Sequence, residues 1–222
     1  MSRPDNARRQ ALLFLGLNAA GACAAGLVHA STQTPDQEAT ASPVEAKEPP
    51  RAERMRKHFP NVPLRTHDGR SVRFYDDLVK GRKVIINFTF TSCTGTCPRT
   101  SANLARVQEM LGDRIGRDIS IVSISIDPEH DTPQRLQDYA ARFGAGDGWL
   151  FLTGSKANVD DVLRRIGQLT PTREAHTTLF ILGNVTTGHW MKLHPDAAPE
   201  EIARRVLLLA GERIDAPRAL QR

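Results

Sequence analysis

The sequence predicts an α/β fold in which a central mixed sheet is flanked by helices, and two patterns carry this prediction. Over residues 83–127 a β-branched run, a stripe at helical spacing and a second strand follow one another, which is the order of a right-handed crossover between parallel strands. Over residues 177–209 a predicted hairpin is followed by a predicted helix. The 222 residues, 40% of them apolar and 25% charged, suffice for one globular domain with appendages.

The first predicted elements form the crossover and its approach. Segment 70–78, "RSVRFYDDL", predicts a short edge strand and a turn, and segment 83–90, "KVIINFTF", has the length and β-branched composition of a buried strand. Pro98 suits the first turn of the helix that follows, and Gly112 suits its end. Segment 118–127, "DISIVSISID", is apolar at every other position and predicts the second strand of the crossover.

The remaining elements complete the sheet. Segment 149–154, "WLFLTG", predicts a short strand, and an amphipathic helix is predicted on either side of it in the sequence. Segments 177–184 and 188–194 predict a hairpin around a glycine-containing turn, and a closing helix follows Pro199. A crossover followed by further helix, a hairpin and a last helix is the element order of the thioredoxin fold, so we expect a thioredoxin-like domain.

The first 30 residues predict export rather than a part of the folded domain. Arg3, Arg8 and Arg9 precede the apolar stretch 11–28, and "VHAS" at 28–31 offers small residues suited to a signal peptidase. The stretch is nearly long enough to remain as a membrane anchor, so a cleaved signal peptide and a retained anchor both stay open. A cytosolic chain with a buried N-terminal helix is the alternative. Export places the protein in the periplasm or on the outer face of the cytoplasmic membrane.

Composition separates a linker from the folded domain and argues against a nucleic-acid partner. Residues 31–50 contain four prolines and no aromatic side chain, so they predict a disordered linker, and the folded domain is assigned to residues 51–222. The formal net charge of +5 comes from scattered basic groups, without the interleaved aromatic side chains of a groove for single-stranded nucleic acid. The basic group 51–57 could lie on anionic lipid if the chain stays anchored.

Two cysteines follow the first strand of the crossover, in "TSCTGTCP" (91–98). Three residues separate Cys93 from Cys97, whereas a redox dithiol of the thioredoxin kind has two. In an exported protein such a pair is a structural disulfide, a redox pair or a set of metal ligands. Cys93 is predicted on the loop that leaves the sheet and Cys97 near the first turn of the helix, whose N-terminus favours a thiolate. Cys23 belongs to the export segment and is assigned no role.

A metal site on two thiolates needs a third ligand, and His176 is the candidate. It directly precedes the strand predicted at 177–184, where the thioredoxin fold usually has the turn that faces the dithiol. A histidine that makes only a local hydrogen bond is the alternative, and His130, His189 and His194 are the fallback ligands. Two thiolates and an imidazole suit copper and also zinc, but structural zinc normally takes a fourth ligand. The set therefore points to copper held for delivery.

Three segments resemble the signature blocks of the SCO/SenC family: "NFTFTSCTGTCP" (87–98), "DPEHDTP" (127–133) and "AHTTLFILG" (175–183). The resemblance extends over about residues 59–211. It implies a thioredoxin-like domain tethered to the outer face of the membrane. It also implies that the domain binds Cu(I) or Cu(II) and serves the assembly of the binuclear copper site of cytochrome c oxidase.

The resemblance implies roles for individual residues. Cys93, Cys97 and His176 match the family's copper ligands, and Asp127 matches an acidic position near the metal, with a supporting role. A strand-end aspartate that caps the next turn is the other interpretation of Asp127. In "DTP" at 131–133, the threonine is expected to cap a helix and the proline to occupy its first position.

Two functions fit these residues. In the first, the protein is a metallochaperone rather than an enzyme. It passes copper by ligand exchange to the copper-site subunit of cytochrome c oxidase, with other periplasmic copper carriers as further partners. In the second, it is a thiol-disulfide oxidoreductase that reduces the cysteines of that copper site or of another envelope protein. One of Cys93 and Cys97 attacks the partner's disulfide and the other resolves it. His176 favours the chaperone, because a dithiol reductase needs no ligand there. A structural disulfide is a third interpretation, although a bridge across so short a loop removes little chain entropy.

Overall fold

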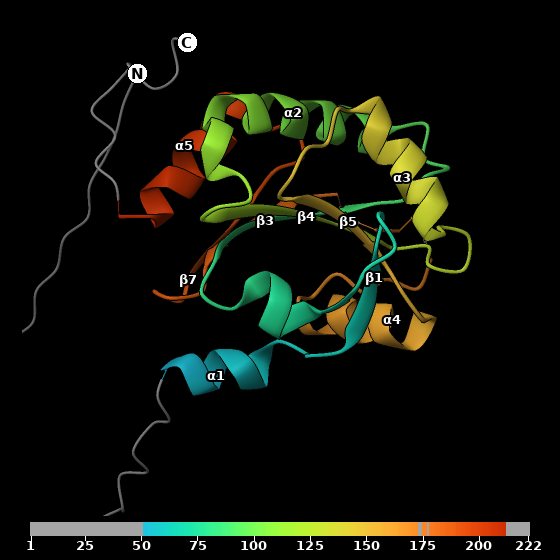
Figure 1. Ribbon diagram of the computed structural model, residues 1–222, viewed down its shortest axis with the longest axis horizontal. Helices are drawn as coiled ribbons and strands as arrows, with labels where there is room; N and C mark the ends of the chain where they lie inside the picture. Colours follow the sequence, from blue (N-terminus) through green and yellow to red (C-terminus); the bar gives the residue numbers. More distant parts are fainter. Residues whose placement is uncertain (1–50, 173–174, 177, 212–222) are drawn as a thin grey trace, which may run out of the picture. The chain divides into compact units, whose positions relative to one another are not determined.

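The computed structural model describes residues 51–172, 175–176 and 178–211 (Figure 1). The export segment and the linker predicted for residues 1–50 lie outside the described residues and stay predictions. Within the described part of the chain, no helix has the length and apolar composition needed to cross a membrane.

In the described residues, seven strands form one mixed sheet. They are β1 (Pro63–Thr66), β2 (Ser71–Arg73), β3 (Lys83–Thr89), β4 (Ile119–Ser125), β5 (Trp149–Thr153), β6 (Phe180–Asn184) and β7 (His189–Leu193). Their order across the sheet is β2-β1-β5-β4-β3-β6-β7. β3, β4 and β5 are parallel, whereas β1 pairs antiparallel with β2 and β5, and β6 pairs antiparallel with β3 and β7. The predicted crossover, hairpin and mixed sheet are therefore confirmed.

Helices cover both faces of this sheet. The α-helices of the described chain are α1 (Arg51–His58), α2 (Thr96–Leu111), α3 (Pro133–Arg142), α4 (Lys156–Arg165) and α5 (Pro199–Leu209). Figure 1 shows α2, α3 and α5 on one face of the sheet and α1 and α4 on the other. Parallel strands that are covered on both faces are buried throughout. Accordingly, all seven residues of β4 and six of the seven residues of β3 are buried.

Successive residues of β3 point into two separate hydrophobic cores, because side chains alternate across a strand. Ile85 belongs to the core that also contains Leu104 of α2 and Leu136 of α3. Val84 and Ile86 belong to the core on the opposite face. The sheet is thus the middle layer of three, and its strand ends are the places where loops reach the surface.

Polar side chains replace apolar ones toward the carboxyl ends of β3 and β4. The Trp149 indole N–H donates to Ser123 Oγ at 2.9 Å, and Ser123 Oγ donates to Asn87 Oδ1 at 2.6 Å. All three residues are fully buried. The serines of segment 118–127 therefore lie inside the protein, since β4 has no solvent-facing side, and each buried polar group needs a partner.

The predicted ends of two helices are confirmed. Pro98 lies in the first turn of α2, and Gly112 ends that helix with a φ of 50° and an N–H that donates to the Gln108 carbonyl. At the start of α3, Thr132 Oγ1 accepts from the Arg135 N–H at 3.3 Å, with Pro133 in the first turn. These caps satisfy backbone groups that a helix end leaves unpaired.

The first elements of the domain, α1 and β1, were not predicted. The sequence indicated neither α1 nor β1, because α1 is only eight residues long and strongly basic and β1 has only four residues. Phe59, which follows α1, is buried and packs against Trp190 of β7 at a ring-centroid distance of 4.9 Å. The predicted edge strand is β2, and the predicted turn after it is a π-helical turn at Phe74–Val79.

Candidate metal centre

The two cysteines lie at the carboxyl end of β3, as the sequence predicts. Cys93 is in the loop between β3 and α2 and is half-buried, and Cys97 is in the first turn of α2 and fully buried. Both are free thiols, and the Cys93 thiol lies near enough to Cys97 to help raise its pKa. The structure therefore brings the two sulfur atoms together without a covalent bond between them.

The free dithiol is protonated at Cys97. Burial, followed by the hydrogen bond with Cys93, raises the pKa of the Cys97 thiol to about 12. The backbone of Phe90 and the hydroxyl of Thr89 act in the opposite direction but do not offset the burial. The expectation that the helix N-terminus would favour a thiolate at this position is therefore wrong for the free dithiol, because desolvation outweighs the helix dipole.

Tyr139 of α3 lies near the dithiol. Its hydroxyl and Ser101 Oγ of α2 are 3.2 Å apart, and both residues are buried. Burial raises the pKa of the Tyr139 hydroxyl, and the nearby thiols of Cys97 and Cys93 add to this effect. Sequence reasoning placed Tyr139 only in the apolar stripe of a helix, because helical spacing does not show which atom its hydroxyl reaches.

His176 lies in the segment that precedes β6, next to the cysteine loop, which we define as residues 90–95 between β3 and α2. Its ring stands edge-on to the Phe90 ring at a centroid distance of 5.8 Å, and Phe90 lies between β3 and Cys93. Its Nε2 is 3.1 Å from Thr178 Oγ1. The local hydrogen bond considered as the alternative is thus present, and the predicted position opposite the dithiol stays a prediction.

The described residues contain no preformed site with three metal ligands. Among them, no three side chains of the types His, Cys, Asp and Glu lie close enough together to hold a metal ion. The ligand set of Cys93, Cys97 and His176 therefore stays a prediction. A cavity of about 530 Å³ is lined by Thr96, which lies between the cysteines, by His176 and by His194. This cavity gives the imidazole of His176 a solvent-accessible approach beside the cysteine loop.

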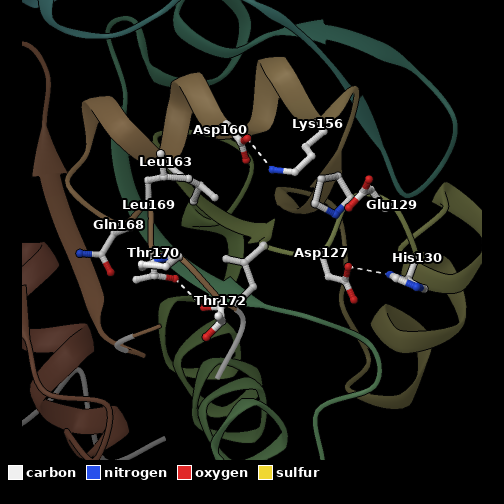
Figure 2. Close-up of a pocket in the computed structure, with 13 residues that line it drawn as sticks. Asp127, Glu129, His130, Lys156, Asp160, Leu163, Gln168, Leu169, Thr170 and Thr172 are labelled. Atoms are coloured by element: carbon white, nitrogen blue, oxygen red, sulfur yellow. Dashed lines mark hydrogen bonds and ion pairs between the residues drawn. The ribbon is translucent and has the colours of Figure 1, made fainter. Parts of the chain in front are cut away.

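Asp127 follows β4 and faces a second cavity, of about 390 Å³ (Figure 2). Its Oδ1 is 2.8 Å from Nδ1 of His130, whose side chain is largely exposed. Lys156 and Asp160 of α4 form an ion pair on the other side of this cavity. The Asp127 carbonyl accepts from the N–H groups of His130 and Asp131, so the residue closes the turn after β4 through its backbone. A supporting role toward a metal stays a prediction.

The fallback histidines occupy separate places. His130 is held by Asp127, His189 is exposed in β7, and His194 accepts from the Asp196 N–H at 3.3 Å through Nδ1. His194 lines the same cavity as His176.

The sequence predicts Asp131 only as part of a helix start. In the structure its carboxylate is buried and bonded to Thr91 in the cysteine loop. A charged residue in a short turn usually indicates a cap, and no sequence pattern indicates that this one points inward.

A family model described as SCO1/SenC matches residues 49–209 of the chain. The SCO1 protein homolog of Bacillus subtilis is 34% identical over 101 residues, which are 44% of this chain and 50% of that protein. The matched segment thus spans about half the length of this curated relative.

Solved structures of the same family resemble the chain over most of their length. Bradyrhizobium japonicum ScoI with copper bound is 25% identical with a TM-score of 0.55, over 66% of this chain and 96% of that chain. BsSco, a member of the Sco family of cytochrome c oxidase assembly proteins in which a disulfide switch was identified, is 25% identical with a TM-score of 0.57. That match covers 70% of this chain and 95% of BsSco. With the mixed sheet described above, these matches confirm the predicted thioredoxin-like fold.

Proposed function

Because the chain belongs to the SCO1/SenC family, we propose that it is an exported copper-binding chaperone that delivers copper to the binuclear copper site of cytochrome c oxidase. Copper is the cargo in this proposal, and Cys93, Cys97 and His176 are its ligands. The copper-bound ScoI and the oxidase-assembly description of BsSco support the choice of metal and partner.

The observation that carries the proposal is the pair of free, neighbouring thiols at the carboxyl end of β3. Two soft sulfur ligands with an imidazole nearby suit copper better than the hard cations that prefer oxygen. The His176 ring contacts Phe90, which follows β3 and precedes Cys93 in the chain. A thiol-only reductase gives no reason for a histidine at this place.

Copper uptake on these residues is coupled to proton release. Metal binding needs thiolates, and the raised pKa of Cys97 means that its proton must leave as the metal arrives. Copper retention is therefore expected to strengthen as the pH rises. Because Cys93 is the more exposed of the two cysteines, an incoming ligand from a partner would reach copper on that side first, and transfer would proceed by ligand exchange.

A thiol-disulfide oxidoreductase is the second candidate, and the same pair of thiols supports it. In that reaction the Cys93 thiolate attacks a partner's disulfide and forms a mixed disulfide, releasing one partner thiolate. Cys97 then attacks Cys93, releases the second partner thiolate and leaves a disulfide in this protein. The partner is reduced by two electrons and the Cys93–Cys97 pair is oxidised by two.

Copper binding is tested by metal content and absorption. The purified protein should hold one copper per chain and, with Cu(II), show thiolate-to-copper charge-transfer absorption. Cys93→Ser or Cys97→Ser should abolish that absorption and leave the circular dichroism unchanged. The matched control is Cys23→Ser, which lies in the predicted export segment and should behave as the wild type. Zinc bound with copper excluded, or absorption that survives both substitutions, would refute the proposal.

Export is part of the proposal and has its own test. Protein taken from the native cell envelope should either lack about 30 N-terminal residues by intact mass or be recovered in the membrane fraction. A full-length chain that is soluble in the cytoplasm would contradict export.

A further inference from the structure

The carboxylate of Asp131 is buried and bonded to the loop that carries Cys93. The residue is 1% exposed. The Thr91 N–H lies 3.2 Å from each carboxylate oxygen, and the Thr91 hydroxyl donates to Oδ1 at 2.5 Å. The Ser125 hydroxyl donates to Oδ2 at 2.6 Å. A buried carboxylate is tolerated only where its oxygens are hydrogen-bonded, so these bonds hold three segments of the chain together.

Asp131 is itself held firmly. Its N–H donates to the Asp127 carbonyl at 2.9 Å, which closes the turn after β4. The next residue, Thr132, is the N-cap of α3. Ser125, the last residue of β4, accepts from the Asp127 N–H at 3.0 Å while it donates to Asp131. The carboxylate is therefore a fixed point at the carboxyl edge of the sheet.

The cysteine loop depends on that fixed point. Each hydrogen bond that Thr91 donates goes to Asp131, through its N–H and its hydroxyl. Two residues later, the Cys93 N–H donates to the Phe90 carbonyl at 3.1 Å, so Cys93 is tied to the turn that contains Thr91. Cys97, by contrast, is fixed by α2, where its carbonyl accepts from the Thr100 hydroxyl at 2.9 Å. One sulfur is placed by a helix and the other by a loop.

We propose that Asp131 is the positioning residue of the dithiol: its hydrogen bonds to Thr91 hold the Cys93 sulfur against the Cys97 sulfur. With respect to copper this inference rests on the proposed function, because the same placement would offer both sulfurs to one ion. With respect to the thiols the inference does not depend on copper. The position that Asp131 gives to the Cys93 sulfur sets its effective concentration toward the Cys97 sulfur.

The test is the equilibrium of the full chain with glutathione. One molecule of oxidised glutathione converts the Cys93–Cys97 dithiol into a disulfide and leaves as two molecules of reduced glutathione, which carry the two thiol protons. Cys23→Ser is present in every protein, so that only Cys93 and Cys97 titrate. Asp131→Asn and Thr91→Val should each lower the equilibrium constant for disulfide formation by about tenfold, the effect of about 1.4 kcal/mol.

Two further variants separate positioning from general stability. Thr91→Ser keeps both donors to Asp131 and should retain the wild-type equilibrium constant. Thr132→Ala removes the N-cap of α3 in the same turn, so it should lower the unfolding temperature without shifting the equilibrium. An equilibrium constant within about twofold of wild type in both Asp131→Asn and Thr91→Val, or an equal shift in Thr132→Ala, would overturn the proposal. If Asp131→Asn does not unfold cooperatively, Thr91→Val decides alone.

A second readout distinguishes this inference from the proposed function. The same proteins are loaded with Cu(I) and titrated with a competing chelator. Weaker copper retention in Asp131→Asn and Thr91→Val, alongside the shifted glutathione equilibrium, would support both proposals. A wild-type chain that holds no copper would end the chaperone proposal, and the glutathione equilibrium would still decide the function of Asp131.

Discussion

At the scale of single residues, the two cysteines are not equivalent. Cys97 is fully buried in the first turn of α2, and Cys93 is partly exposed in the loop before it. Burial is the first cause of the high pKa of Cys97, and the neighbouring thiol is the second. The pair therefore combines a protonated inner thiol with an accessible outer one. This asymmetry suits a site at which metal or a partner arrives from one side.

The pKa of Cys97 leads to a pH profile that can be measured. In a chain with Cys23→Ser and Cys93→Ser, we expect alkylation of Cys97 by iodoacetamide to keep rising with pH beyond about 9.5, where an ordinary thiol has levelled off. The reason is that burial, the largest cause, remains when Cys93 is removed, and only the thiolate reacts. The matched control is the same chain unfolded in urea, which should level off at the ordinary pH. Equal profiles in the folded and unfolded chains would contradict the burial argument.

The candidate site was partly predictable at this scale. The motif predicts that Cys93 and Cys97 follow one strand, and the structure has both at the carboxyl end of β3. That His176 joins them as a ligand stays a prediction. Asp131 was not found. Its importance depends on the direction of one buried side chain, and local patterns do not determine which polar groups meet across some 40 residues of sequence.

At the scale of elements, the hairpin of β6 and β7 explains a glycine inside an apolar strand. Gly183 is paired with Trp190 across the hairpin, and the Trp190 ring lies over the glycine. A Cβ atom at Gly183 would come within 2.1 Å of that ring. Trp190 also contacts Phe59, so the glycine allows the ring to close the core next to α1.

Replacement of Gly183 by alanine should therefore displace the Trp190 ring. We expect the free energy of unfolding to fall by about 1–3 kcal/mol, which is typical of overpacking. We also expect a change in tryptophan fluorescence as the Trp190 ring moves away from Phe59. Trp149 is fully buried and bonded to Ser123, so it should contribute an unchanged signal. Gly146→Ala is the control, because its Cβ would only touch the Gln108 side chain at 3.6 Å. Equal urea midpoints for the two variants would count against the close contact.

The long elements were predictable, and the short ones were not. The strands at 83–89 and 119–125 and the helix from Thr96 carry long apolar patterns and appear where expected. α1 and β1 have too few residues to show a period. Phe59, which lies between them in the chain, packs against the distant Trp190. The π-helical turn at Phe74–Val79 buries Phe74 and Val79, which a local turn prediction does not reveal.

At the scale of the whole domain, the candidate site lies at one edge of the sheet, and two hydrophobic cores stabilise the fold. The cysteine loop, the turn after β4 and the segment before β6 come together only because β3 is flanked by β4 and β6 in the sheet. His176 belongs to neither hydrophobic cluster. Substitutions at His176 should therefore change the chemistry of the site without unfolding the domain.

The central claim is that the protein delivers copper, and His176 separates this task from dithiol reduction. The most direct measurement is cytochrome c oxidase activity at limiting copper in cells that carry only the His176→Ala protein. Loss of one of the three proposed ligands should weaken copper retention while both thiols stay reactive, so oxidase activity should fall. Added copper should restore it at least partly by mass action. Cells with His189→Ala, an exposed histidine of β7, should match the wild type. Wild-type oxidase activity in the His176→Ala cells would contradict the chaperone and favour the reductase.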